Sequence, residues 1–509
     1  MTLYQTKTIT YRNGFFFLEN FEEEEIPAWI TKDYSDLKPY FHLNLLTREK
    51  FKRDLLPGIK ENKILISKDT FNLIKYYPKT DYSIQGVVNT PHIEPEGITL
   101  KDHQDIAVNI MLKNKKFGFF LGTGTGKTLI AITWLLNKKL IGDILIVTPK
   151  KVIDQYQDEC KKYLPKDILD RLTIINFESL NKVADYYFEA VIVDESHRAK
   201  SATSKIYLTL SKIIQKADYA YLFTGTPQDK QRHDIITQLS LLDKRYMPSK
   251  TRMLFRYFLF DDYYTPKQER AEVKDEIDSM INEITWGKET HEVINLTEEN
   301  IFKVMCPHPG LFYEELKKEY IVNIGGLDIV ADNKGVLKIK LREICSGHIK
   351  TTEEPIKTIE LPNPKVEPLE NLLETVKHGI IYTEFDEDIV FVTRSLNKLK
   401  RTYVIVNGKT KKSGHLIDKF KEGEVDYLVI QSKSGNAGLD LTNTNNVIFY
   451  SMPESYIVYH QCKSRIRRIG QHEACNYYHL ICENTVEEQI YNSLKRKKSF
   501  STRLFKLYN

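Results

Sequence analysis

The amino-acid sequence lacks the features of membrane and secreted proteins. It has no apolar run of about 18 residues, the length that a membrane-spanning helix needs, and its first residues lack the apolar core of a signal peptide. Its six cysteines form no Cys-x-x-Cys pair and are not spaced as in small disulfide-rich domains. We therefore expect a cytoplasmic protein with reduced cysteines and no membrane segment.

Strong net charge and internal repeats are absent as well. The formal charge of +5 is slight for 509 residues and says little about partners by itself. Residues 495–509 hold six Lys or Arg and no acidic residue, a composition typical of a solvated terminus and of a phosphate-binding patch alike. A chain of this length exceeds what one hydrophobic core serves, so several globular domains are expected.

What the sequence does contain is two series of short apolar runs that alternate with helical segments. Runs of this kind, each ending in polar or turn residues, are typical of parallel strands covered by helices on both faces. The first series comprises 144–149, 172–177, 190–195 and 219–227, and the second comprises 378–385, 402–408, 426–432 and 446–453. The predicted fold class is α/β, with two parallel-sheet domains in tandem.

Composition divides the chain further. Polar stretches that contain proline at 89–99 and 351–368 are typical of joints between domains, and a helix is expected over 267–284. The predicted parts are a small N-terminal accessory domain with possible DNA contact (1–97), a first sheet domain (98–245), a mainly helical insertion (246–345) and a second sheet domain with a basic C-terminal tail (346–509).

The string LGTGTGKT at 121–128 follows an expected strand and precedes an expected helix at 129–136. Strand, glycine loop and helix N-terminus in this order bind anions, because backbone N–H groups can approach phosphate oxygens and the helix dipole favours negative charge. Lys127 is expected to reach the β- and γ-phosphates, and the Thr128 hydroxyl to bind Mg²⁺. The cofactors predicted are therefore ATP and Mg²⁺. Leu121 departs from the general pattern, which has glycine there.

Asp194 and Glu195 end the apolar run AVIVDE, so both are expected in the crevice that holds the glycine loop. Neighbouring side chains on a regular strand point to opposite faces, so the strand must end there for both to converge. Hydrolysis of ATP needs one carboxylate in the magnesium shell, assigned to Asp194, and another that orients or deprotonates water, assigned to Glu195. His197 is expected to relay between the nucleotide and the turn at 224–226, or to cap the following segment.

Arg465 and Arg468, in the string QCKSRIRRIGQ, are three residues apart and would share one face of a helix. Two guanidinium groups directed together suit the charge that develops on a transferred γ-phosphate. They lie in the second sheet domain and the glycine loop in the first, so closure of the two domains would complete the site. Arg467 is expected to point elsewhere.

These motifs, in this order, make the chain resemble a superfamily 2 helicase of the Swi/Snf-like branch, and most of all the compact versions carried by bacteriophages. The resemblance covers about 98–490. The matching strings are LKDHQ from 100, LGTGTGKT, VTPKKVIDQY, INFESL, DESHRAK, LFTGTP, LREICSGH, IIYTEF, SKSGNAGLDLT and QCKSRIRRIGQ. The resemblance implies two RecA-like domains and, for a phage protein, the host cytoplasm.

The resemblance also implies roles for single residues. Gln104 would read the adenine, and Gln461 would bridge the two domains near the γ-phosphate. The rest of the predicted nucleotide-binding set is Gly122, Gly124, Gly126, Leu129, Gly438 and Asp440. The residues expected near the nucleic-acid backbone are Thr148, Lys150, Thr383, Lys433 and Ser434.

The leading hypothesis is an ATP-driven helicase or translocase that moves on duplex DNA and remodels or unwinds branched DNA in replication, recombination or repair, for example by branch migration. DNA would be held mostly through its phosphate backbone, and the protein is expected to be a monomer. Three alternatives stay open: an RNA helicase, the motor subunit of a restriction system, and a nucleotide-gated binding module without productive hydrolysis.

Overall fold

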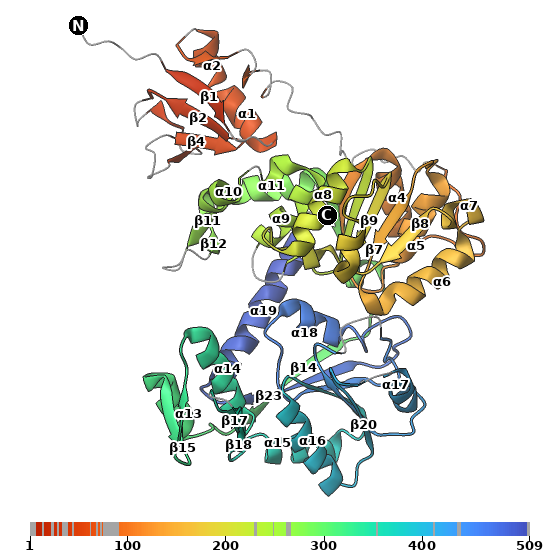
Figure 1. The fold of residues 1–509 in the computed structure, drawn as a ribbon, viewed down its shortest axis with the longest axis vertical. Helices are drawn as coiled ribbons and strands as arrows, with labels where there is room; N and C mark the ends of the chain where they lie inside the picture. Colours follow the sequence, from red (N-terminus) through yellow and green to blue (C-terminus); the bar gives the residue numbers. More distant parts are fainter. Residues whose placement is uncertain are drawn as a thin grey trace. The chain divides into compact units, whose positions relative to one another are not determined.

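The computed structural model describes residues 7–12, 15–21, 25–27, 30–32, 39–42, 45–61, 63–67, 70–71, 74, 91–228, 232–247, 249–260, 266–352, 355–410, 413–434 and 439–505. The chain divides into two compact units. The first comprises Met1–Val293 with Arg503–Asn509, and the second comprises Ile294–Thr502 (Figure 1).

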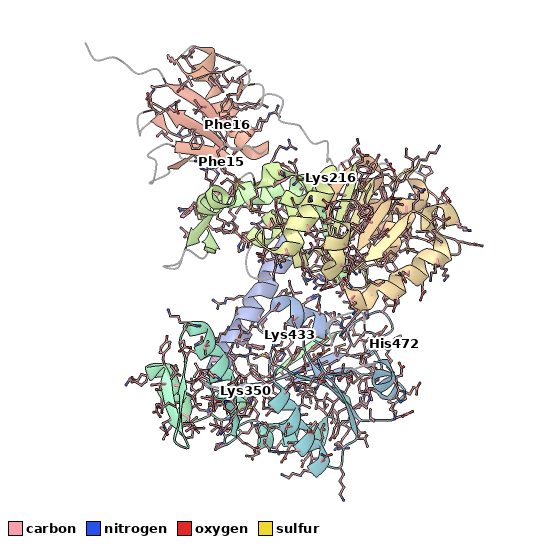
Figure 2. All side chains as sticks on the ribbon, in the orientation of Figure 1. Phe15, Phe16, Lys216, Lys350, Lys433 and His472 are labelled. Atoms are coloured by element: carbon pink, nitrogen blue, oxygen red, sulfur yellow. The ribbon has the colours of Figure 1, made fainter. Side chains whose placement is uncertain are left out.

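The first unit begins with a small sheet in the strand order β3-β4-β2-β1-β5. Its elements are β1 (Thr8–Arg12), β2 (Phe15–Glu19), β3 (Thr31–Lys32), β4 (Pro39–His42), α1 (Leu45–Asp54), α2 (Leu56–Lys60) and β5 (Leu65–Ile66). Successive side chains of a strand point to opposite faces. Phe16 of β2 therefore packs in the small core of this sheet, while Phe15 and Phe17 join the larger core of the unit. Phe15 and Phe16 are labelled in Figure 2.

The second sheet of this unit is entirely parallel, in the order β13-β6-β10-β9-β7-β8. Its strands are β6 (Lys116–Leu121), β7 (Ile144–Val147), β8 (Leu172–Ile175), β9 (Ala190–Asp194), β10 (Tyr219–Thr224) and β13 (Thr285–Lys288). The associated helices are α4 (Asp102–Lys113), α5 (Lys127–Asn137), η2 (Lys150–Val152), α6 (Ile153–Tyr163), α7 (Lys166–Leu169), η3 (Phe177–Val183), η4 (Ser196–Ala199), α8 (Lys205–Lys216), α9 (His233–Leu242) and η5 (Lys244–Tyr246).

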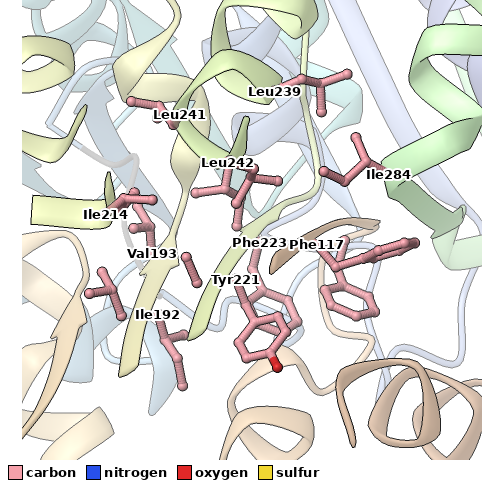
Figure 3. Packing of buried hydrophobic residues seen from close by; sticks show 14 of the residues in the cluster. Phe117, Ile192, Val193, Ile214, Tyr221, Phe223, Leu239, Leu241, Leu242 and Ile284 are labelled. Atoms are coloured by element: carbon pink, nitrogen blue, oxygen red, sulfur yellow. The ribbon is translucent and has the colours of Figure 1, made fainter. Parts of the chain in front are cut away.

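Helices cover both faces of this sheet, so its central strands are apolar along their length. Figure 3 shows side chains of β9 and β10, among them Val193 and Phe223, beside Leu239 and Leu242 of α9. All four are buried. This core holds the strand ends that carry the motifs.

The remaining elements of the first unit are α10 (Lys250–Tyr257), β11 (Phe258–Phe260), β12 (Pro266–Glu269), η6 (Ala271–Val273), α11 (Lys274–Ile284) and α12 (Thr290–Val293). The helix expected over 267–284 begins only at Lys274, because β12 and η6 precede it. Buried Arg256 pairs with buried Glu276 at 2.7 Å, and Lys50 of α1 lies 3.6 Å from the same carboxylate. This charge cluster ties the N-terminal part to α11.

The second unit contains the other parallel sheet, in the order β14-β23-β22-β19-β21-β20. Its strands are β14 (Glu299–Cys306), β19 (Gly379–Thr383), β20 (Tyr403–Val406), β21 (Tyr427–Gln431), β22 (Asn446–Phe449) and β23 (Cys475–Cys482). Its helices are α15 (Val366–Thr375), α16 (Asp386–Lys398), α17 (Gly414–Lys421), α18 (Tyr456–Lys463) and α19 (Val486–Phe505). The predicted fold class, two RecA-like parallel-sheet domains, is confirmed.

An accessory region completes the second unit, with α13 (Leu311–Glu319), β15 (Ile321–Ile324), β16 (Leu327–Val330), α14 (Lys334–Cys345), β17 (His348–Lys350) and β18 (Thr358–Glu360). Gly325 and Gly326 have φ of 59° and 83° and make the tight turn of the β15–β16 hairpin. The stretch 246–345 is therefore not one helical insertion. It supplies β13 to the first parallel sheet and β14 to the second, and the boundary between the two units along the chain falls within it.

All six cysteines are buried and free, as the sequence predicts. Cys345, Cys482 and Glu487 lie close enough to hold a metal ion, but the buried Lys365 ammonium bonds Glu487 at 2.5 Å and already supplies the positive charge. Among the helices in the described part of the chain, none has the length and apolar character needed to cross a membrane.

Candidate nucleotide-binding site

The glycine-rich loop lies between β6, which ends at Leu121, and α5, which begins at Lys127. Gly124 and Gly126 have φ of 76° and 85°, a left-handed conformation that favours glycine. A β-carbon at Gly126 would also lie 2.2 Å from Nε2 of Gln104. Lys127 Nζ donates to the carbonyl oxygens of Leu121 and Gly122, both at 3.2 Å. The ammonium group is therefore directed into the loop, where phosphate oxygens would be its partners.

Two neighbouring side chains of α4 support the loop. Gln104 Nε2 donates to the Thr125 carbonyl at 3.0 Å, and His103 Nε2 lies 2.8 Å from the same oxygen. Burial lowers the pKa of His103, which keeps its ring neutral. The sequence singled out Gln104 and missed His103, although the two are adjacent. A direct contact between Gln104 and adenine stays a prediction.

The acidic pair sits where β9 ends. Asp194 is the last residue of β9, and Glu195 has a φ of 54°, a left-handed conformation that costs energy for a residue with a side chain. The strand thus ends at the point where both carboxylates can serve one crevice. Burial first, and then the charge of Glu195, raises the pKa of Asp194 to about 6, while the charge of Lys127 opposes this shift.

Glu195 belongs to a polar triangle with His197 and Thr224. His197 Nδ1 lies 3.0 Å from Thr224 Oγ1 and 3.2 Å from Glu195 Oε2. Thr224 Oγ1 donates to the same carboxylate at 3.4 Å and accepts from the Thr226 N–H at 3.1 Å. His197 thus contacts the turn at 224–226, and its relay to the nucleotide stays a prediction. The triangle joins the ends of β9 and β10.

Tyr156 of α6 is a member of the site that the sequence did not single out. It is buried, and burial followed by the charge of Asp194 raises its pKa well above the usual value, while a hydrogen bond with Thr128 opposes the shift. Tyr156 ends the string VTPKKVIDQY, but nothing in that string distinguishes a tyrosine of the core from one at the site. The Thr128 hydroxyl and the Asp194 carboxylate are oxygen ligands of the kind that Mg²⁺ prefers.

In the second unit, Arg465 and Arg468 converge on one oxygen. Their Nη1 atoms donate to the Leu439 carbonyl at 3.3 Å and 3.0 Å. The expectation that they share a helix face is wrong, because α18 ends at Lys463 and both arginines follow it in turns. Arg467 points elsewhere, as expected, and donates to the Thr297 carbonyl at 2.8 Å.

The other residues of the second unit that the sequence predicts to contact the nucleotide are Gln461, Asp440 and Gly438. Gln461 is half-buried on α18, and Asp440 is exposed and accepts from the Thr442 hydroxyl at 3.0 Å. Gly438 lies outside the described residues. Their nucleotide contacts stay predictions.

The residues predicted to contact nucleic acid fall into two groups. Thr148 and Thr383 are both 0% exposed, and the Thr148 hydroxyl donates to Asp194 at 3.4 Å. Both hydroxyls are covered in this conformation, and contact of either one with a phosphate stays a prediction. Lys150 and Lys433 are exposed and Ser434 is half-buried, so these three keep the expected access. Lys433 is labelled in Figure 2.

Substitution of Asp194 by asparagine should stabilise the protein at neutral pH. The folded state raises the pKa of Asp194 from 3.8 to about 6, so stability due to its protonated form is lost as pH rises through this window. The gain for Asp194→Asn should therefore grow from about pH 4 to about pH 6 and stay constant above, reaching a few degrees in Tm. Calorimetry over this range measures it, and equal Tm values at neutral pH would contradict a buried carboxylate.

A parallel sheet with a glycine loop after one strand and an Asp-Glu pair at the end of another defines a P-loop nucleotide-binding domain. Residues 97–229 match the family "Type III restriction enzyme, res subunit", and residues 364–470 match "Helicase conserved C-terminal domain". The chain is similar to superfamily 2 helicases of the Swi/Snf-like type, the resemblance that its motif order indicates. ATP is the nucleotide that this similarity implies.

Several known proteins are similar to this chain in sequence. An uncharacterized ATP-dependent helicase of Mycoplasma pneumoniae is 24% identical over 78% of this chain and 41% of its own length. A putative ATP-dependent helicase/translocase of Bacillus subtilis is 23% identical over 81% of this chain and 49% of its own. The human DNA repair and recombination protein RAD54B is 23% identical over 72% and 50%. The chain thus spans less than half the length of the first two relatives.

Among solved structures, the Sulfolobus solfataricus SWI2/SNF2 ATPase core in complex with dsDNA is 18% identical, with a TM-score of 0.36. The match covers 81% of this chain and 94% of that chain.

Proposed function

We propose that the chain is an ATP-dependent translocase that moves along duplex DNA and remodels or unwinds branched DNA. The observation that carries this proposal is the division of the reactive groups between two units. Lys127, Asp194 and Glu195 lie in the first unit, and the convergent Arg465 and Arg468 lie in the second. If hydrolysis needs the residues of both units, it can proceed only when the units approach each other. Each turnover would then be coupled to the approach and separation of the units.

The residues of the first unit would bind the nucleotide with its Mg²⁺ and activate the attacking water. Lys127 would exchange the carbonyls of Leu121 and Gly122 for phosphate oxygens, which are stronger acceptors because they are charged. Thr128 and Asp194 would hold Mg²⁺, which neutralises phosphate charge when bound.

Glu195 would orient the attacking water and accept its proton, as a general base does. His197 and Thr224 hold this carboxylate through the contacts of the polar triangle. Because two partners restrain one carboxylate oxygen, the group is oriented before the nucleotide arrives. Preorganisation of this kind lowers the cost of reaching the transition state.

We propose that Arg465 and Arg468 face the γ-phosphate once they leave the Leu439 carbonyl, with Gln461 between the units. Gln104, the loop glycines at 122, 124 and 126, Leu129, Gly438 and Asp440 would complete the nucleotide contacts. Lys150, Lys433 and Ser434 would contact the DNA backbone, which needs charge and hydroxyl groups but no base recognition. We also propose that the protein acts as a monomer in the cytoplasm and that its nearest kin are phage-encoded, in which case the cytoplasm is that of the host.

The test is ATP hydrolysis with fork, Holliday-junction, linear duplex and RNA substrates, paired with unwinding and branch-migration assays on the same molecules. Duplex or branched DNA should stimulate turnover, and stimulation should weaken as salt rises because phosphate contacts release counterions. Stimulation by RNA alone would contradict the DNA assignment and favour an RNA helicase.

A second candidate function is the motor of a restriction system, since residues 97–229 match a family named for a restriction enzyme subunit. Co-purification from the native source decides it. A nuclease that remains bound through two chromatographic steps would favour this function, and recovery of the chain without one would count against it.

A further inference from the structure

The segment that leads out of the first unit lies directly on the glycine loop. Strand β13 pairs in parallel with β6, and Lys288 stands opposite Leu121, the residue at which the loop begins. Helix α12 follows as Thr290–Val293, and the second unit begins at Ile294. The chain therefore passes the nucleotide site immediately before it leaves the unit.

Two hydrogen bonds attach this segment to the loop. The Gly122 N–H donates to the Lys288 carbonyl at 3.0 Å, and the Thr290 hydroxyl donates to the Thr123 carbonyl at 3.0 Å. A β-carbon at Gly122 would lie 2.2 Å from Thr290 Oγ1 and 2.6 Å from its backbone nitrogen. Glycine at 122 is thus required by the close approach of Thr290, since the φ of Gly122 is not in the left-handed region.

The same stretch of loop holds Lys127. Its ammonium group donates to the carbonyls of Leu121 and Gly122, while the N–H of Gly122 is held by β13. A lysine that turns to a triphosphate releases both carbonyls. Phosphate binding would therefore change the hydrogen bonds of the same loop residues to which the outgoing segment is hydrogen-bonded.

We propose that Thr290 is a positioning residue that couples the occupancy of the glycine loop to the segment leading into the second unit. Its hydroxyl transmits a change at Leu121–Thr123 to α12, which begins at Thr290 and ends at the unit boundary, Val293. This inference rests on the proposed function, because it assigns the route by which nucleotide binding alters the grip on DNA. It adds a residue that lies outside every motif of the chain.

The experiment measures the Kd of the full-length chain for duplex DNA with and without a non-hydrolysable ATP analogue, and takes the ratio. Thr290→Val keeps the shape of the side chain and removes the hydroxyl. A single hydrogen bond corresponds to roughly a 2–10-fold change in an equilibrium, so the ratio should fall toward one by about that factor. Thr290→Ser keeps the hydroxyl and should retain the ratio of the parent protein.

Thr209→Val is the matched control. Its hydroxyl donates to Asn181 at 3.0 Å in the same unit, on α8, and does not touch the loop. It should leave the ratio unchanged. If Thr290→Val does not fold, as judged by its Tm, Thr290→Ala takes its place in the same assay.

An unchanged ratio in Thr290→Val or Thr290→Ala would overturn the inference, and so would a loss of the ratio in Thr290→Ser. The proposed function fails separately. In that case the parent protein itself would show no DNA-stimulated hydrolysis and no effect of the analogue on DNA affinity.

Discussion

Replacement of Arg468 by alanine should lower DNA-stimulated ATP hydrolysis by about 10³–10⁵-fold, the effect that an arginine directed at the γ-phosphate has in other P-loop enzymes. The guanidinium group offsets charge that is greatest in the transition state, so turnover should suffer far more than nucleotide binding. Phosphate release at saturating ATP and duplex DNA measures the first quantity, and titration with a fluorescent nucleotide measures the second.

Arg394→Ala is the control for this substitution. Arg394 is an exposed arginine of the same unit that donates to Glu360 at 2.7 Å, so its loss should leave turnover within about twofold, as expected for a surface ion pair. The Tm of both variants should be compared, because Arg468 also donates to the Leu439 carbonyl. A folded Arg468→Ala protein with full DNA-dependent turnover would contradict the two-unit mechanism.

Replacement of Glu195 by glutamine should lower hydrolysis by about 10²–10⁴-fold, the usual contribution of a general base. Glutamine keeps the size of the side chain and a carbonyl oxygen for Thr224 and His197, but it cannot take the proton of the attacking water. Nucleotide binding should persist, because Lys127, Thr128 and Asp194 are unchanged. The same two assays apply.

Glu178→Gln is the matched control, since Glu178 is an exposed carboxylate of the same unit paired with Arg198 at 2.7 Å. It should retain the turnover of the parent protein. Hydrolysis by Glu195→Gln at the parent rate would remove the general base from the mechanism and revive the alternative of a nucleotide-gated binding module.

The glycine loop and the acidic pair could be predicted because their geometry is local. The loop needs a strand before it and a helix after it, and both follow from apolar runs within 20 residues of chain. Asp194 ends a buried strand, so its place at the carboxyl edge of a parallel sheet follows from the run itself.

The limits of the insertion could not be predicted. Both β13 and β14 lie at the edge of a sheet. Strand β13 has only the four residues TWGK, and β14 has exposed residues along much of its length. An edge strand is covered on fewer sides and need not be apolar throughout, so it lacks the signal that marks a central parallel strand. Membership of a sheet is then decided by pairing with residues more than 150 positions away.

The arginines and the two threonines show a second limit. A spacing of three predicted a shared helix face, whereas Arg465 and Arg468 meet through a carbonyl on another segment. Thr383 ends β19 and Thr148 directly follows β7, as the pattern required, but the burial of each side chain depends on what covers the strand end. That cover comes from parts of the chain remote in sequence.

The sequence by itself determined the class of fold, the nucleotide loop and the acidic residues, because each depends on the conformation of a short continuous segment. Only the tertiary structure decided which strands form the edges of each sheet, that His103 and Tyr156 belong to the site, and that Thr290 is hydrogen-bonded to the loop. These depend on hydrogen bonds and packing between segments distant in sequence, whose partners no local pattern identifies.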